Sequence, residues 1–493
     1  MLWAVVLIPA VAGLAAMLPP LRQIRRALLL LGALGHSSAV AWLCMSPLAD
    51  AGSSWIGLDA PGRLFLAITS VLFLAAAIYA VGYLRTGEGL ATHDMEEGFL
   101  FRNEPEGIFI GCLLLFLATM SLVCMSQHLG LLWVAVEATT LASAPLISFH
   151  RHHRSLEATW KYLMICSVGI ALALLGIFFL AAAGRGQVSS LTLGNLLSAA
   201  TRMDPAWLKA AFILLLVGYG TKMGLAPMHT WLPDAHSEAP SLVSALLSGA
   251  LLNCAFLGLL RGHAILAAAG LAHFSGELLI VLGLLSMGAA AVFMIRQTDY
   301  KRLLAYSSIE HMGILALGVG LGGLAATGAM LHAVNHSITK GLLFLAAGNL
   351  LAFYRTKSIH DIQGVLKSMP VTGCLWVAGF LAITGSPPFG LFLSELTILK
   401  GALDGGHWYI SALYLLALGV IFVAMARLIL PMAFGSPTKA AAAAEMAQGP
   451  TREPAWSVIP PLVLGAIVLV LGVFVPAPLW DALREAAAAI GGH

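Results

Sequence analysis

The segment that decides the fold reads Ala206-Trp-Leu-Lys-Ala-Ala-Phe-Ile-Leu-Leu-Leu-Val-Gly218-Tyr-Gly-Thr-Lys222-Met-Gly-Leu-Ala-Pro227-Met228. It has the length and the apolar character of a membrane-spanning helix, which needs roughly 20 residues. Proline removes a backbone donor and clashes with the preceding turn, so this helix is predicted to break partway across the membrane. Backbone groups freed at that depth persist only inside protein or beside a wet cavity. The segment therefore predicts a broken span that carries a buried cation, Lys222.

The composition of the whole chain supports a membrane protein. Of its 493 residues, 59% are hydrophobic and 10% are charged, whereas soluble domains are about 25% charged. The six cysteines are scattered singly and form no CxxC pair, so neither a metal cluster nor a disulfide framework is expected. The net charge of +3 does not indicate nucleic acid binding, because the basic residues lie in short loops. We also find no haem motif or nucleotide-binding loop, so electrons are not expected to enter this chain.

The apolar runs predict an all-α, polytopic protein with about fourteen spans. The predicted spans are 2–18, 27–46, 61–84, 108–126, 128–149, 157–183, 206–228, 240–261, 275–296, 303–323, 325–352, 372–399, 408–432 and 456–478. Residues 479–493 are expected to form a short surface helix and a tail. Loops after odd-numbered spans are richer in Arg and Lys, which places them in the cytoplasm and both termini outside. We expect a bacterial cytoplasmic (inner) membrane.

A second interrupted span indicates an internal repeat. It reads Thr384-Gly-Ser-Pro387-Pro388-Phe-Gly390 within the twelfth predicted span. Two interrupted helices at corresponding positions are typical of repeated transporter folds. An odd number of helices in each unit forces the second unit to start from the opposite side of the membrane, so the two repeats are predicted to be inverted. The predicted parts of the chain are 1–107 (three helices), 108–261 (first five-helix repeat), 275–432 (second repeat) and 456–493 (last helix and tail).

Several ionisable side chains lie inside predicted spans, where each costs roughly 2.5–3.5 kcal/mol on insertion scales. These residues are Glu137, Lys222, Glu310, Lys340 and Glu395. A change in the charge of one such group alters the proton affinity of its neighbours, since Coulomb coupling is strong at low dielectric. The charges therefore predict a buried proton path. Glu137 with Lys222 is also compatible with a structural ion pair between two helices.

Histidines add to this pattern. His332, His336 and Lys340 recur every four residues and so share one helix face, where they favour either a water file or hydrogen bonds between helices. His229 and His236 flank Pro233 and indicate either proton uptake or a polar loop. Glu310 and His311 are adjacent, so we expect at least one of them to make a structural or interface contact.

Four segments carry a family resemblance. They are residues 222–236, 299–308, 332–340 and 385–390. Through them the chain resembles, over roughly residues 60–430, the proton-pumping antiporter-like subunits of respiratory complex I and of multisubunit sodium/proton antiporters. Residues 307–313 and 239–249 make it most similar to the membrane component F of hydrogenase-4, which belongs with formate hydrogenlyase and other membrane-bound nickel–iron hydrogenases.

The resemblance implies roles for particular residues. Glu137 matches the fifth-helix glutamate of the family and Lys222 the seventh-helix lysine that pairs with it. Lys340 matches the relay residue of the eleventh helix, and Glu395 the terminal residue of the twelfth. Relatives often carry a lysine or histidine on the eighth helix, where this chain has Ser248 and Asn253. The central bridge is therefore expected to be water, or histidine from elsewhere.

The resulting hypothesis is a proton-translocating, non-catalytic subunit of a respiratory or hydrogenase redox complex, related to NADH:quinone oxidoreductase. A redox reaction in a partner perturbs Glu137, Lys222 passes a proton toward Lys340, and Glu395 releases it outward. The expected partners are lipid, other membrane subunits and a peripheral redox arm with nickel–iron and iron–sulfur centres. No cofactor or metal is expected in this chain. The alternatives are a Na⁺(K⁺)/H⁺ antiporter subunit without redox coupling, and a membrane anchor with vestigial charges.

Overall fold

The structure of the chain is a computed structural model that describes residues 2–18, 21–47, 54–86, 92–93, 100–436 and 453–491. Helices form nearly all of it. Twelve of the described helices are long and apolar enough to cross a membrane, and Leu2–Met17 and Pro370–Ile383 are shorter apolar helices. Within the described ranges the only strands are β1 (Thr92–His93) and β2 (Leu100–Phe101), which pair antiparallel. The predicted all-α, polytopic fold is confirmed.

The helices fall into four groups along the chain. The first is α1 (Leu2–Met17), α2 (Arg22–Met45) and α3 (Ala60–Thr86). The second is α4 (Glu106–Met125), α5 (Leu129–Ile147), α6 (His153–Ala183), α7 (Leu193–Ala199), α8 (Pro205–Met223), α9 (Trp231–Glu238), α10 (Ser241–Leu246) and α11 (Leu252–Ala268). The third is α12 (Ala272–Met294), α13 (Tyr300–Leu321), α14 (Gly323–Tyr354), α15 (Val365–Ser368), α16 (Pro370–Ile383), α17 (Gly390–Asp404) and α18 (Trp408–Phe434). The last is α20 (Ala455–Val473) and α21 (Ala477–Ala489).

The interruption of the seventh span begins just after Lys222, which the sequence predicts to lie at the break. Helix α8 remains helical through Lys222 to Met223 and ends at Gly224, which has the left-handed φ of +83° that a glycine cap adopts readily. The chain is non-helical over 224–230 and becomes helical again in α9. Helix α8 therefore ends before the predicted boundary at residue 228. The sequence did not predict that a separate helix, α9, follows the break.

The interruption of the twelfth span lies where the sequence predicts it. Helix α16 ends at Ile383 and α17 begins at Gly390. Gly385 between them has a φ of +61°, and a Cβ at that position would overlap the carboxylate of Glu395. The predicted span of 372–399 thus consists of two short helices joined by a turn. The non-helical backbone of that turn lies beside the buried side chain of Glu395.

Three spans lie in the interior of the bundle. The continuous helix Ser241–Ala268, α13 and α14 are 100%, 94% and 83% buried over their most apolar windows, whereas most windows of the outer spans are far less buried. Residues 247–251 form one π-helical turn between α10 and α11. Because the interior spans are enclosed by other helices, side chains on any of their faces can be buried.

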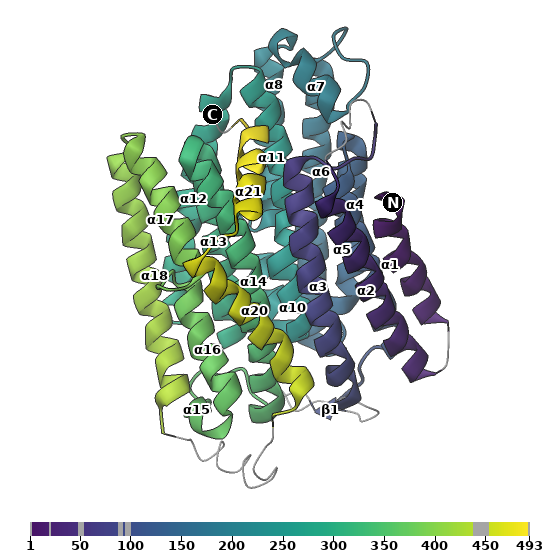
Figure 1. Ribbon diagram of the computed structural model, residues 1–493, viewed down its shortest axis with the longest axis vertical. Helices are drawn as coiled ribbons and strands as arrows, with labels where there is room; N and C mark the ends of the chain where they lie inside the picture. The colour runs from purple at the N-terminus through teal and green to yellow at the C-terminus, as the bar shows by residue number, and fades with distance from the viewer. Residues whose placement is uncertain are drawn as a thin grey trace.

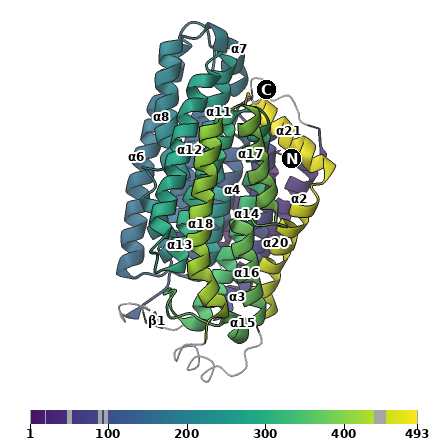
Figure 2. The same cartoon turned by 90° about the vertical axis from the view of Figure 1, so that its left-hand side faces the viewer.

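The two ends of the bundle are distinct. Figures 1 and 2 show α7 at one end, and β1 and α15 at the other. We call these the α7 end and the β1 end. The marked chain termini both lie in the half that carries α7 (Figure 1). Helix α21 packs against α3 and α14 and buries Leu483, so the predicted surface helix has one buried face.

Candidate functional site

The first polar cluster surrounds the end of α8. Lys222 is fully buried. Its Nζ donates to Thr140 Oγ1 on α5 at 2.8 Å and to the Tyr162 hydroxyl on α6 at 2.6 Å. The same ammonium lies 4.4 Å from the centre of the Tyr162 ring, an attractive cation–π geometry. The Tyr162 hydroxyl is 2.6 Å from Ser143 Oγ, so the cluster extends further along α5.

Glu137 joins this cluster through a hydroxyl. Thr140 Oγ1 donates to Glu137 Oε2 at 3.4 Å, and Ser167 on α6 donates to Glu137 Oε1 at 2.8 Å. Among the described residues no hydrogen bond or ion pair connects Glu137 to Lys222 directly. The structure brings the two predicted partners together, but with Thr140 between them.

The second polar cluster surrounds Lys340 on α14. The lysine is fully buried, and its Nζ donates to the backbone carbonyl of Leu304 at 2.6 Å and to Ser307 Oγ, both on α13. A Coulomb interaction couples it to Glu310, which in turn is coupled to Glu395. Lys340 therefore faces α13 and lies within electrostatic reach of the acidic groups in the same half.

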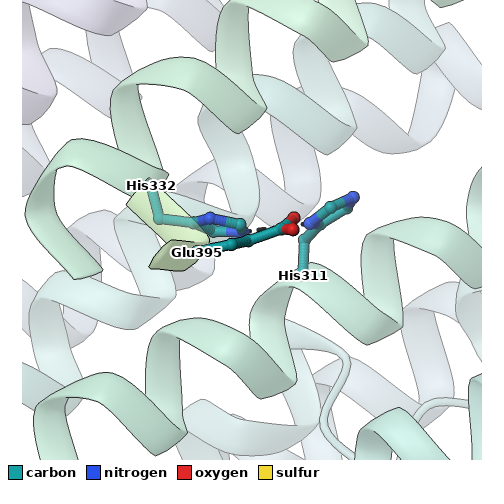
Figure 3. A group of neighbouring side chains, drawn as sticks. All are labelled: His311, His332 and Glu395. Carbon is teal, nitrogen blue, oxygen red and sulfur yellow. Dashed lines mark hydrogen bonds between the residues drawn. The ribbon is translucent and has the colours of Figure 1, made fainter. Parts of the chain in front are cut away.

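Histidines and Glu395 occupy the interior beyond Lys340. His311 Nδ1 lies 3.0 Å from His332 Nε2, and His332 Nδ1 lies 3.0 Å from Ser394 Oγ on α17. The ring of His336 is centred 5.0 Å from that of His311. Figure 3 shows Glu395 reaching between His311 and His332. The predicted stripe of His332, His336 and Lys340 thus faces α13.

Glu310 and His311 are both in the interior, although they are adjacent in sequence. Glu310 is 2% exposed and His311 is fully buried. At least one of the pair was expected to make a structural or interface contact. Both are buried because α13 is surrounded by other helices, which the sequence alone did not reveal.

The eighth span lies between the two clusters and presents neutral polar groups. Ser248, within the π-helical turn, is 2.8 Å from Ser308 Oγ on α13. Asn253 donates to Ser337 Oγ on α14 at 2.8 Å, and its own carbonyl oxygen is buried without a hydrogen-bond partner among the described residues. π-Helical turns occur frequently at functional sites. An unpartnered amide oxygen in the interior is suited to accept a hydrogen bond from water.

A cavity of about 470 Å³ lies at the β1 end. Its polar lining includes His150, Ser237, Glu238, Lys301 and Lys357. Lys357 and Glu238 form an ion pair at 2.8 Å, whereas the Lys301 ammonium donates to the backbone carbonyls of Ser237 and Ala239. The cavity is thus lined by charged groups that are already paired or hydrogen-bonded.

His236 connects this cavity with the second cluster. It precedes Ser237 of the cavity wall, and its ring stacks on Phe344 with centroids 5.1 Å apart. Phe344 lies one helical turn after Lys340. Both ring nitrogens of His236 are buried without a hydrogen-bond partner among the described residues. His229 instead lies beside Phe293 and Tyr306, toward the outer face of α12.

Sequence reasoning missed several members of these clusters. Thr140 lies three residues after Glu137 and Ser307 three residues before Glu310, so helical spacing could have indicated both. Tyr162 and Ser394 have no such spacing from a charged residue of the predicted path. No local pattern marks them, because their roles arise from helix packing.

Comparisons with known proteins agree with these observations. The sequence model of the family described as "NADH:quinone oxidoreductase/Mrp antiporter, TM" matches residues 126–421. The chain is 38% identical over 399 residues to the "Hydrogenase-4 component F homolog" of Methylacidiphilum infernorum, covering 79% of this chain and 81% of that protein. It is 31% identical over 409 residues to NADH-quinone oxidoreductase subunit N of Desulforudis audaxviator, covering 81% and 78%.

Solved structures show the same fold. A chain of the archaeal membrane-bound sulfane sulfur reductase superposes with a TM-score of 0.85 at 22% identity, covering 99% of this chain and 97% of that chain. A chain of Thermus thermophilus respiratory complex I superposes with a TM-score of 0.81 at 24% identity, with full coverage of both. The family model and the sequence relatives confirm the resemblance found from sequence motifs, and these structures confirm the fold.

Proposed function

We propose that this chain, which belongs to the NADH:quinone oxidoreductase/Mrp antiporter family of transmembrane proteins, is the proton-translocating subunit of a hydrogenase-type redox complex. The burial of two lysines is the main support for this proposal. Lys222 and Lys340 are both fully buried, and within the described residues neither forms a hydrogen bond or an ion pair with a carboxylate. A buried ammonium that is not directly bonded to an anion is costly. Such lysines are suited to take up and release protons rather than to hold helices together.

Protons are taken up at the β1 end in this proposal. Several arginines lie at this end of the spans, which favours a cytoplasmic location for the β1 end: Arg85, Arg102, Arg151 and Arg355. Protons enter the cavity there and reach Lys340 by way of His236. Both termini then lie on the outer side of a bacterial cytoplasmic membrane.

The two lysines communicate across the eighth span. Ser248 and Asn253 supply hydrogen bonds but cannot titrate near neutral pH, so water completes the link between the clusters. A change in the charge of Glu137 alters the hydrogen bond that Thr140 accepts from Lys222. Lys222 then passes its proton toward Lys340. Glu395 releases the proton toward the α7 end.

Redox coupling takes place in partner subunits in this proposal. The 38% identity to a hydrogenase-4 component F homolog favours partners with nickel–iron and iron–sulfur centres, and no cofactor in this chain. The alternative is a subunit of a Na⁺(K⁺)/H⁺ antiporter. Purification of the intact complex with metal analysis separates the two: stoichiometric nickel and iron support redox coupling, and a complex free of both supports the antiporter.

The proposal is tested by proton movement in membrane vesicles that contain the assembled complex. Glu137→Gln and Lys222→Met are expected to abolish most proton translocation while assembly is retained. Lys209→Met is the matched control, because Lys209 lies on the same helix but is exposed. Full translocation in both interior variants would exclude the assignment, and loss of assembly without a translocation defect would favour the membrane-anchor alternative.

A further inference from the structure

Two imidazoles and a carboxylate meet in the interior of the second repeat. His311 comes from α13, His332 from α14 and Glu395 from α17. One ligand atom from each of the three lies within 4.8 Å of the others. Figure 3 shows the Glu395 carboxylate extending between the two rings. Three donors from three packed helices thus converge on one small volume.

A neighbouring hydroxyl orients the cluster. Ser394 Oγ donates to the carbonyl of Leu391 at 2.9 Å, so it accepts its other hydrogen bond from His332 Nδ1 at 3.0 Å. This places the proton of His332 on Nδ1 and its lone pair on Nε2, which faces His311. Metal-binding histidines are held in this way, with the non-ligating nitrogen donating to a fixed neighbour.

The cluster also contains an unmet polar atom. Glu395 Oε1 is buried without a hydrogen-bond partner among the described residues. Native interiors satisfy nearly all buried polar atoms, so an unsatisfied carboxylate oxygen beside two imidazoles indicates that something binds there.

We propose that His311, His332 and Glu395 bind one divalent transition-metal ion of the zinc class. Two histidines and a carboxylate form a known zinc donor set, whereas Mg²⁺ and Ca²⁺ require a shell of oxygens. Nitrogens on a tetrahedral zinc ion lie roughly 3.3–3.4 Å apart, given Zn–N bonds of about 2.0–2.1 Å. The observed 3.0 Å between His311 Nδ1 and His332 Nε2 therefore has to widen by only a few tenths of an ångström.

Metal and protons compete for these atoms. When the ion binds, the proton of His311 moves from Nδ1 to Nε2, so both rings coordinate the ion as neutral imidazoles. A bound ion replaces the His311–His332 hydrogen bond and occupies the Glu395 carboxylate, so neither is free to transfer a proton. If the proposed function holds, zinc therefore inhibits proton release, a consequence that rests on that proposal, whereas binding itself does not.

Binding is tested with the full-length chain in detergent, prepared without a polyhistidine tag. Titration with Zn²⁺, and with Co²⁺ read from its visible absorption, is expected to give one ion per chain. His332→Gln removes one of the three proposed ligands and is expected to weaken binding by more than tenfold, since loss of even a residue that only supports a ligand costs about 10–100-fold. The matched control is His273→Gln, which removes an exposed histidine 3.6 Å from Glu277 and leaves binding unchanged.

A second measurement does not depend on any variant. X-ray absorption of the zinc-loaded chain is expected to show imidazole nitrogen and carboxylate oxygen at about 2.0–2.1 Å. The proposal is overturned if no stoichiometric ion binds, if the spectrum lacks imidazole, or if His332→Gln binds as tightly as the parent. Failure of proton translocation in vesicles would leave the binding result intact, so the two proposals fail separately.

Discussion

At the scale of single residues, the first cluster depends on a hydroxyl that stands between two charges. Thr140 accepts from Lys222 at 2.8 Å and donates to Glu137 at 3.4 Å, while Ser167 holds the other carboxylate oxygen. A hydroxyl can both donate and accept, so it transmits a change at one charge to the other. The hydrogen-bonded link between Glu137 and Lys222 thus runs through one side chain.

Thr140→Val tests this link, since it keeps the shape of the side chain and removes the hydroxyl. A lost hydrogen bond of about 1 kcal/mol is expected to slow proton translocation roughly fivefold. Thr140→Ser retains the hydroxyl and should restore most of the rate in the same vesicle assay. Equal rates for the valine and serine variants would show that the hydroxyl plays no part.

His150, in the cavity wall at the β1 end, gives a pH-dependent test. It lies between α5 and α6, and its ring contacts Asn103 and Tyr83 at 2.8 and 3.1 Å. Burial, with repulsion from His152 and Lys301, lowers the pKa of His150 to about 3. Between about pH 6.5 and pH 3 the unfolded chain binds a proton at His150 and the folded chain does not. The free energy of unfolding therefore falls as the pH drops through this range.

Replacement of His150 by Gln removes this contribution. The melting temperature in detergent is expected to fall less steeply between pH 7 and pH 5 for His150→Gln than for the parent chain. His273→Gln, which removes an exposed histidine, should keep the parental slope. Identical slopes for parent and His150→Gln would contradict the assignment of a neutral imidazole.

At the scale of elements, the two broken helices place backbone and charge together. Lys222 precedes the break that begins at Gly224, and Glu395 packs against Gly385 in the other break. The sequence predicted both interruptions from proline and glycine. Residues up to Met223 remain helical, so the first begins just after Lys222, and nothing in the local pattern marked α9 as the second half.

Gly385→Ala tests the role of the second break. A Cβ there meets the Glu395 carboxylate, and a non-glycine residue in the left-handed region costs about 1–2 kcal/mol. The variant is expected to melt several degrees lower and to translocate protons poorly. Gly419→Ala in α18 is the control, because a Cβ there meets nothing within 4 Å. A variant at Gly385 that behaves like the control would show that the close packing has no function.

At the scale of the whole molecule, the sequence predicted the fold well and the site in part. Apolar runs identified the spans because lipid imposes one length and one composition on each. The buried lysines and Glu395 stood out for the same reason. The contacts of Tyr162 and Thr140 with Lys222, and of Ser307 with Lys340, could not be predicted, since they form only through packing between different helices.

In the proposed mechanism the interior charges move protons while partner subunits move electrons. Both fluxes can be measured in vesicles that contain the complex with Lys340→Met. Electron transfer is expected to persist, while the number of protons moved per electron pair falls well below that of the parent and of Lys209→Met. An unchanged ratio in Lys340→Met would contradict this mechanism.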